Sequence, residues 1–176
     1  MTRLLLVAAC LLLFGLALLG MWLGWRHRGR RQDWLPELPP VPAALGVELA
    51  DPLTGLYVGT TAATRWQDRI VARGLGTRAA ATARLTEAGV LIERQGGDPV
   101  FLPSGQLVDA RLEPALAGKV VGQGGLLVLR WRHGDNDLDT GLRADDKTGY
   151  PAWLTAVNGA EIRADQTPAN ENEALR

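Results

Sequence analysis

The first hydrophobic segment of the chain, Leu4–Trp25, has twenty-two residues and no charge. A helix of this length rises about 33 Å, enough for a hydrocarbon core about 30 Å thick. In lipid each backbone amide needs a partner within its own segment, which favours a helix. The pattern therefore predicts a single membrane-spanning helix.

The residues that flank this segment predict its orientation. Tryptophan suits the membrane interface, and an excess of arginine marks the cytoplasmic side. We therefore expect a single-pass protein of the cell (inner) membrane, with its N-terminus outside and its folded part in the cytoplasm. The predicted boundary residues are Trp22, Trp25, Arg26, Arg28, Arg30 and Arg31.

Two other interpretations of the N-terminus are a cleaved signal peptide and a lipoprotein signal. A signal peptide ends in small residues, whereas Trp22 and Trp25 stand at this end. The segment before Cys10 resembles a lipobox, but only six apolar residues, Leu4–Ala9, precede the cysteine. A membrane anchor is favoured. Cys10 is the only cysteine, so the chain forms no internal disulfide.

Farther along, short apolar runs separated by glycine, asparagine and aspartate predict a mainly β domain. One helix is expected among the strands, at Arg65–Arg73, from the spacing of Trp66, Ile70 and Val71. The expected strands are Leu56–Val58, Ala80–Leu85, Val90–Arg94, Val100–Leu102, Leu107–Leu112, Lys119–Gly122, Leu126–Arg132 and Asp137–Leu142.

The last element has a helical period. Tyr150, Trp153, Leu154 and Val157 form one apolar stripe. Thr148 is the expected N-cap, and Asn158-Gly159 the expected C-cap. The predicted fold class is mainly β (α+β), a bent sandwich or barrel of six or seven strands capped by this helix.

Composition divides the chain into four predicted regions. They are the anchor with its basic stop (1–31), a proline-rich spacer (32–53), the folded domain (54–160) and a disordered tail (161–176). Residues 32–176 carry 14 Lys+Arg and 19 Asp+Glu, a net charge of −5. An acidic domain of this kind argues against nucleic-acid binding.

Three motifs carry a resemblance to a known family: Gly55–Thr61, Leu116–Val121 and Leu138–Asp145. With the hydrophobic N-terminus, they are similar to small actinobacterial single-pass membrane proteins that contain a pleckstrin-homology-like (PH-like) domain. Such proteins are often labelled as transporters or export proteins. The resemblance implies the PH-like fold and brings no catalytic residues. A transport role fits poorly with one spanning helix, which offers no midplane substrate site.

Two motifs resemble ligand sites. Gly74–Ala79 fits a dinucleotide fingerprint, with Glu93 at a suitable distance, but its leading strand Asp68–Arg73 is too charged for a buried strand. Asp135, Asp137, Asp139 and Asp146 fall at calcium-loop positions, but Thr140 stands where that loop needs glycine. A glycine-rich loop and a hairpin turn are favoured, and no cofactor or metal is expected.

Arg65, Arg69 and Arg73 recur every fourth residue and would share one helical face. Such a stripe could face an anionic membrane surface. Asp68 interrupts it, however, and a charged stripe is more often the solvated side of a helix.

The chain has few residues suited to catalysis. Its histidines are His27 and His133, and its only serine is Ser104. Asp109 and Glu113 could form an acid–base pair, but solvated charges are favoured. We therefore expect that the protein is not an enzyme.

The expected function is a noncatalytic interaction module at the membrane that binds a protein or peptide partner. The expected groove lies between a sheet edge and the final helix, where unpaired amides can accept an added strand. The alternatives are an anionic-lipid sensor that uses the three arginines and a transport or export accessory protein. The partner, its cellular process, any bound headgroup or small ligand, and the oligomeric state stay open.

Overall fold

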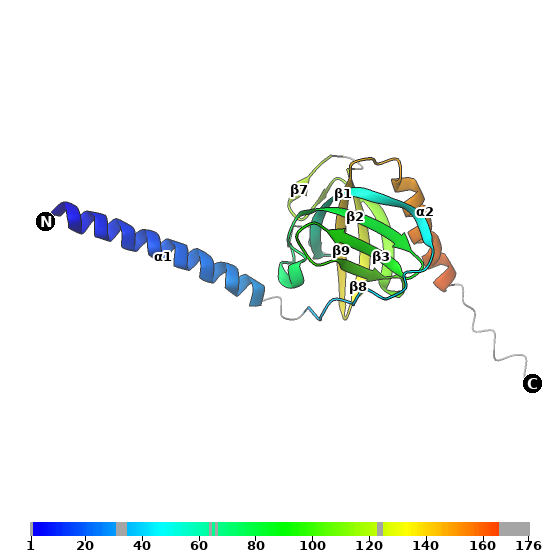
Figure 1. Cartoon of the computed structure of the whole chain (residues 1–176), viewed down its shortest axis with the longest axis horizontal. Coiled ribbons are helices and arrows are strands. Elements are labelled where there is room, and N and C mark those ends of the chain that lie inside the picture. The colour runs from blue at the N-terminus through cyan, green and yellow to red at the C-terminus, as the bar shows by residue number, and fades with distance from the viewer. Residues whose placement is uncertain (1, 31–34, 64, 66, 123–124, 166–176) are drawn as a thin grey trace, which may run out of the picture. The chain divides into compact units, whose positions relative to one another are not determined.

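The computed structural model describes residues 2–30, 35–63, 65, 67–122 and 125–165. The chain forms two compact units, Met1–Leu35 and Pro36–Arg176. The elements are α1 (Thr2–Arg30), β1 (Glu48–Ala62), the 3-10 helix η1 (Ala72–Gly74), β2 (Ala79–Thr86), β3 (Gly89–Arg94), β4 (Val100–Pro103), the 3-10 helix η2 (Ser104–Gln106), β5 (Leu107–Glu113), β6 (Ala115–Leu116), β7 (Lys119–Val120), β8 (Leu126–His133), β9 (Asn136–Ala144) and α2 (Tyr150–Asp165) (Figure 1).

The first unit contains α1, so the helical conformation predicted for Leu4–Trp25 is confirmed. Over the described residues, no helix combines the length and the apolar character needed to cross a membrane. Among the predicted boundary residues, Trp22 is exposed. The side chains of Trp25, Arg26, Arg28, Arg30 and Arg31 lie outside the described part of the chain.

The second unit is built on one seven-stranded antiparallel sheet, ordered β4-β3-β2-β1-β9-β8-β5. The long strand β1 pairs with β2 over Glu48–Tyr57 and with β9 over Gly55–Ala62. At Gly55 the two pairings overlap, and a Cβ there would collide with the carbonyl oxygen of Arg143. Glycine therefore lets three strands meet closely where the sheet bends. The predicted mainly β fold class is confirmed.

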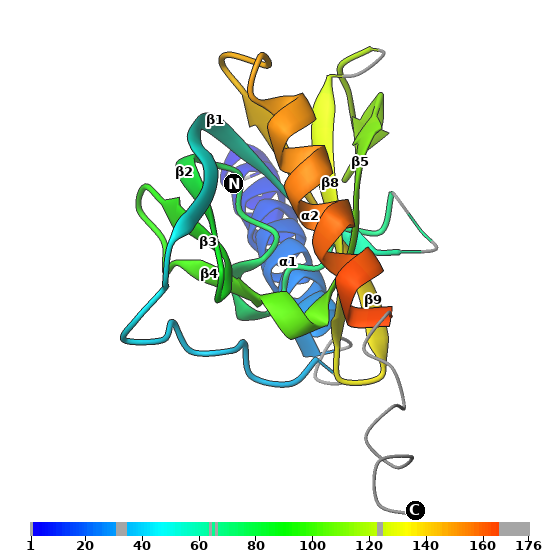
Figure 2. The ribbon, with the colours of Figure 1, turned by 90° about the vertical axis from the view of Figure 1, so that its right-hand side faces the viewer.

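The C-terminal helix α2 lies beside β5 and also contacts β1 (Figure 2). Trp153 is fully buried, and its Nε1–H donates to the carbonyl oxygen of Asp51 at 2.9 Å. The helix continues to Asp165, so the C-cap predicted at Asn158-Gly159 is wrong. This helix and the inner face of the sheet enclose a core whose large buried side chains include Tyr57, Leu127, Leu129, Trp131 and Trp153.

A short hairpin, β6–β7, covers part of the outer face of the sheet, which we define as the face that carries Arg130 and Arg132. Leu116 and Ala117 from this hairpin form a second buried cluster with Val58, Leu126 and Val128. Residues 126 and 128 are therefore buried although they alternate with core residues on β8. Burial on both faces explains the continuous apolar run Leu126–Leu129.

The helix predicted at Arg65–Arg73 is wrong. The amide of Ile70 donates to the carbonyl oxygen of Thr60, and the amide of Thr60 donates to the carbonyl oxygen of Leu75. Thr61 and Arg69 also form an isolated antiparallel bridge. These contacts hold the segment against β1, and among its described residues only Ala72–Gly74 forms a helical turn.

The predicted spacer, 32–53, is partly built into the domain. The amide of Ala88 donates to the carbonyl oxygen of Leu45. The Nε2 atom of His133 lies 3.3 Å from the carbonyl oxygen of Pro36. Strand β1 begins at Glu48, so the predicted domain start at residue 54 is too late. At the other end, residues 161–165 belong to α2, and the rest of the predicted tail lies outside the described residues.

Candidate functional site

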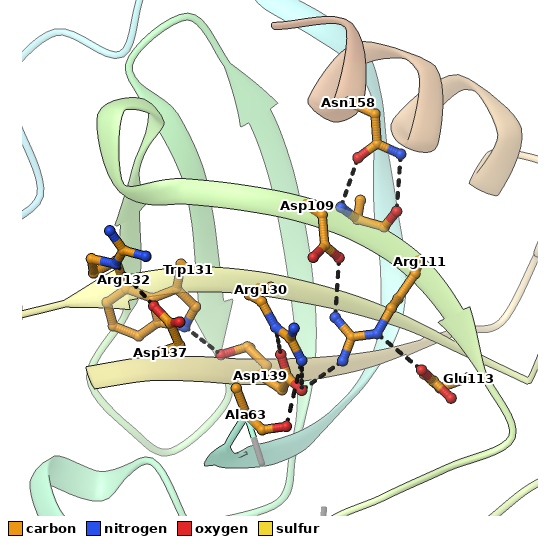
Figure 3. Close-up of polar contacts among 12 residues, drawn as sticks. Ala63, Asp109, Arg111, Glu113, Arg130, Trp131, Arg132, Asp137, Asp139 and Asn158 are labelled. Carbon is orange, nitrogen blue, oxygen red and sulfur yellow. Dashed lines mark hydrogen bonds and ion pairs between the residues drawn. The ribbon is translucent and has the colours of Figure 1, made fainter. Parts of the chain in front are cut away.

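The most unusual polar feature of the outer face is a buried carboxylate held by two arginines (Figure 3). The Asp139 side chain is only 4% exposed. Its Oδ2 accepts from Nη2 of Arg111 at 2.6 Å, and its Oδ1 accepts from Nε of Arg130 at 3.0 Å. Such charge-assisted bonds offset the large penalty for burying a carboxylate.

Arg111 is the centre of this network. Its Nη1 donates to Asp109 at 3.0 Å, and its Nε donates to Glu113 at 2.9 Å. Burial acts to lower the pKa of Arg111, but the hydrogen bonds and charge of Asp139, with the bonds to Glu113 and Asp109, raise that pKa above its usual value. The hydrogen bond to Asp139 is also the main reason that the pKa of Arg130 is raised. Both guanidinium groups are thus firmly charged.

Strand pairing brings these residues together. Asp109 lies opposite Arg130, and Arg130 lies opposite Asp139 on the next strand. Side chains directly opposite one another share a face, and so do residues two apart on one strand, which adds Arg111 and Glu113. The cluster is therefore a cross-strand charge ladder over β5, β8 and β9.

A pocket of about 460 Å³ adjoins this ladder. Its size falls within the range of small-ligand and side-chain pockets. One wall is apolar and comes from the residue after β1, the β5–β6 connection and β6, and the other wall is charged. The lining residues are Ala63, Arg111, Glu113, Pro114, Ala115, Leu116, Arg130 and Asp139. We call this hollow the outer-face pocket.

The three arginines predicted to face a membrane do not share a face. Arg65 pairs with Asp68 at 3.3 Å in the exposed turn. The guanidinium of Arg69 donates to the carbonyl oxygens of Gly76 and Ala117, at 2.8 and 2.9 Å. Burial, and then the charge of Arg78, lower its pKa. Arg73 is exposed in a left-handed backbone conformation, φ 53°. The predicted stripe is wrong because no helix aligns these side chains.

The two ligand-like motifs also have other roles. Gly74 ends the 3-10 helix η1 rather than following a strand, and Gly74–Ala79 leads into strand β2 rather than a helix, so the favoured glycine-rich loop is confirmed over the dinucleotide fingerprint. In the calcium-like motif, Asp137 pairs with Arg132, and Asp139 pairs with Arg130 in the charge ladder. Among the described residues, no group of three His, Cys, Asp or Glu side chains could hold a metal ion.

The residues considered for catalysis are dispersed. His133 is buried beside Trp131, with ring centroids 5.2 Å apart, and Ser104 begins η2. The side chain of His27 lies outside the described residues. Asp109 and Glu113 do lie near each other, but both bind the guanidinium of Arg111. They are members of an ion-pair network rather than an acid–base pair.

The predicted partner groove, between a sheet edge and the final helix, is closed at Ala110. The side chain of Asn158 accepts from the amide of Ala110 at 2.8 Å and donates to its carbonyl oxygen at 3.0 Å. At this point of β5, the edge that an added strand would need is already hydrogen-bonded.

Sequence reasoning missed Arg94. Its guanidinium donates to the carbonyl oxygens of Gly74 and Asp98, and it lies 5.0 Å above the ring centre of Tyr57. It thereby ties two loops to the core. The only sequence signal was a lone arginine at the end of an apolar strand.

A bent antiparallel sheet closed by a C-terminal helix, with its polar features on the outer face and in the loops, defines a PH-like module. The sequence profile of the Bacterial PH domain-like family matches residues 35–158, and the chain belongs to this family. No curated protein and no solved structure matches the chain. The PH-like part of the sequence resemblance is thus confirmed.

Proposed function

We propose that the protein is a noncatalytic interaction module that binds a protein or peptide partner through the outer-face pocket. PH-like domains are generally noncatalytic, and this chain belongs to such a family. The observation that carries the proposal is the pocket itself, about 460 Å³ between an apolar wall and the charge ladder. Apolar walls with a few fixed polar groups are typical of sites that bind a ligand or an inserted side chain.

The anchor predicted at Leu4–Trp25 is the second part of the proposal. It places the domain on the cytoplasmic side of the cell membrane, in reach of partners at that surface. The support is the charge asymmetry between Arg3 before this segment and the four arginines after it. A reporter active only in the cytoplasm, fused after Arg176, should be active. A stronger signal from a reporter active only outside would reverse the orientation.

The pocket assignment is tested by site-specific photocrosslinking in membranes that contain the full chain. The crosslinking amino acid replaces Ala115, which lines the pocket, or Lys147, which is exposed in the turn before α2. We expect one protein to be captured from position 115 and not from position 147. Capture of the same proteins from both positions, or of none from position 115, would refute the proposed site.

An anionic-lipid sensor is the alternative. Arg65, Arg73 and Arg78 are exposed in the loop between β1 and β2. Against this reading, Arg65 pairs with Asp68, and Arg69 is bound to backbone carbonyls. The transport or export role implied by the resemblance has no observation in its favour among the described residues.

A further inference from the structure

We propose that the outer-face pocket accepts a lysine or arginine side chain of the partner. This inference rests on the proposed function, because it names the chemistry of the partner at the same site. The argument uses the charge of the ladder, the accessibility of its members and the character of the pocket walls.

The charge of the ladder is negative. Asp109, Glu113 and Asp139 contribute three negative charges, and Arg111 and Arg130 contribute two positive charges. One negative charge is therefore left without a cation inside the network, and it belongs to the ladder as a whole, because Asp109 does not line the pocket and the lining itself pairs two carboxylates with two arginines. Residues 32–176 as a whole also carry a net charge of −5.

An anionic ligand would meet guanidinium groups in which, among the described residues, only Nη1 of Arg130 lacks an acceptor. Each of the three guanidinium nitrogens of Arg111 donates to a different carboxylate. Arg130 donates from Nε and Nη2 to Asp139. Asp139 is 4% exposed, so an anion that drew either guanidinium away would weaken the pairing of a buried carboxylate.

A cationic ligand meets an accessible carboxylate. Glu113 lines the pocket and is 37% exposed. Its Oε1 accepts from Nε of Arg111, and within the described part of the chain no protein group donates to its Oε2. This oxygen can accept from an ammonium or guanidinium group of the partner.

The other wall suits the stem of the same side chain. Ala63, Pro114, Ala115 and Leu116 present mainly apolar surface. Lysine and arginine combine an apolar stem with a charged head, and they bury the stem while the head stays at a polar rim. The pocket offers apolar contact and a carboxylate side by side, which matches this division.

The test is an NMR titration of the isotopically labelled full chain in detergent micelles. The probes are acetylated, amidated pentapeptides Ala-Ala-X-Ala-Ala, in which X is Lys, Arg, Leu or Glu. We expect the Lys and Arg peptides to shift the amide signals of Ala115 and Leu116, and the Glu peptide to leave them unchanged. Added salt should weaken the Lys and Arg titrations, because partly exposed charge pairs are screened.

Three variants sharpen the test. Glu113→Gln keeps the shape of the side chain and should weaken Lys-peptide binding on the order of fivefold, as expected for a partly exposed charge pair. Ala115→Glu adds a carboxylate to the wall and should strengthen it. Glu93→Gln is the matched control, since Glu93 pairs with Arg84 on another part of the sheet.

Four results would overturn the inference: stronger shifts with the Glu peptide, equal shifts with Leu and Lys, unchanged affinity in Glu113→Gln, or no shift with any peptide. A gain of affinity in Ala115→Glu could not come from a folding defect. The photocrosslinking experiment separates the two proposals. Partner capture from position 115 without a preference for Lys or Arg leaves the proposed function intact and removes this inference.

Discussion

The side chain of Asn158 on α2 forms hydrogen bonds with both backbone groups of Ala110 on β5, at 2.8 and 3.0 Å. An asparagine amide carries one acceptor and a donor group, so it pairs with a strand residue much as a neighbouring strand would. This contact joins the last helix to the edge of the sheet, and it protects that edge from pairing with another chain.

Replacing Asn158 with alanine should destabilise the protein. Both backbone groups of the buried residue Ala110 would lose their partner, at a cost of about 1–3 kcal/mol. Asn158→Asp should also destabilise, because a carboxylate cannot donate to the carbonyl oxygen. Urea denaturation of the full chain, followed by tryptophan fluorescence, measures the effect. Thr155→Ala, at an exposed position of the same helix, is the control. Equal midpoints for Asn158→Ala and Thr155→Ala would contradict the role of this contact.

Trp153 should anchor α2 in the core. The side chain is fully buried, and its indole N–H donates to Asp51. Trp153→Ala should lower the free energy of unfolding by about 3–5 kcal/mol. Trp153→Phe keeps much of the apolar contact and should cost less. An unchanged denaturation midpoint in Trp153→Ala would show that α2 does not close the sheet.

Gly141 should be required by the hairpin that covers it. A Cβ at this position would lie 2.5 Å from Cδ2 of Leu116, so that side chain would have to move. Gly141→Ala should destabilise by about 1–3 kcal/mol, as overpacking does. In a Leu116→Ala background the penalty should shrink, and a double-mutant cycle measures this coupling. Gly105→Ala, with open space around its Cβ, is the control. If the effects of Gly141→Ala and Leu116→Ala on the free energy of unfolding simply add, the proposed contact between these two positions is excluded.

Tyr57 should make stability fall at high pH. Burial raises its pKa to about 12, against the opposing effects of the Thr60 hydrogen bond and of Arg94 and Arg69. The unfolded state has an ordinary tyrosine pKa of about 10, so it loses this proton first, and the contribution to stability is present below pH about 10 and is lost toward pH about 12.

The size of this loss is roughly 2–3 kcal/mol. Denaturation midpoints measured from pH 9 to 12 should fall less steeply in Tyr57→Phe than in the natural chain. Parallel curves would show that Tyr57 does not stay protonated in the fold. The comparison also separates Tyr57 from Tyr150, whose pKa burial raises as well.

Binding to anionic lipid should not depend on the loop arginines. The aligned stripe is absent, Arg65 pairs with Asp68, and Arg69 is held by backbone carbonyls. Full chain reconstituted in neutral vesicles should capture few added anionic vesicles at physiological salt. The double variant Arg65→Gln/Arg73→Gln should capture as few anionic vesicles as the unchanged chain. Strong capture that this variant loses would favour the lipid sensor.

The sequence pattern predicted most of the strands and the final helix well, because the strands are short apolar runs between turn residues and the final helix has a helical period. The helix at Arg65–Arg73 failed because Ile70 and Thr60 pair across the loop, a contact that local spacing does not encode. The early part of β1 was missed for a related reason. Residues 48–53 alternate poorly, and their strand conformation depends on pairing with β2.

The candidate site was less predictable. Asp109 and Glu113 were noticed as nearby carboxylates, whereas their partner Arg111 and the opposing pair Arg130 and Asp139 depend on strand register. A shift of one residue would send these side chains to the other face. Register follows from the whole sheet, so the ladder could be recognised only in three dimensions.

The β6–β7 hairpin has a consequence for how sequences of this family can diverge. Its Leu116 and Ala117 lie against Gly141 and Gly59, where added side chains would meet them at 2.5 and 3.4 Å. Relatives that keep a hairpin of this length should keep small residues at both sites. Relatives in which the hairpin is deleted should be free to carry a larger residue at position 141, whereas the φ of +143° at Gly59 favours glycine with or without the hairpin. The length of one surface insertion and the identity of one distant glycine are thus expected to change together.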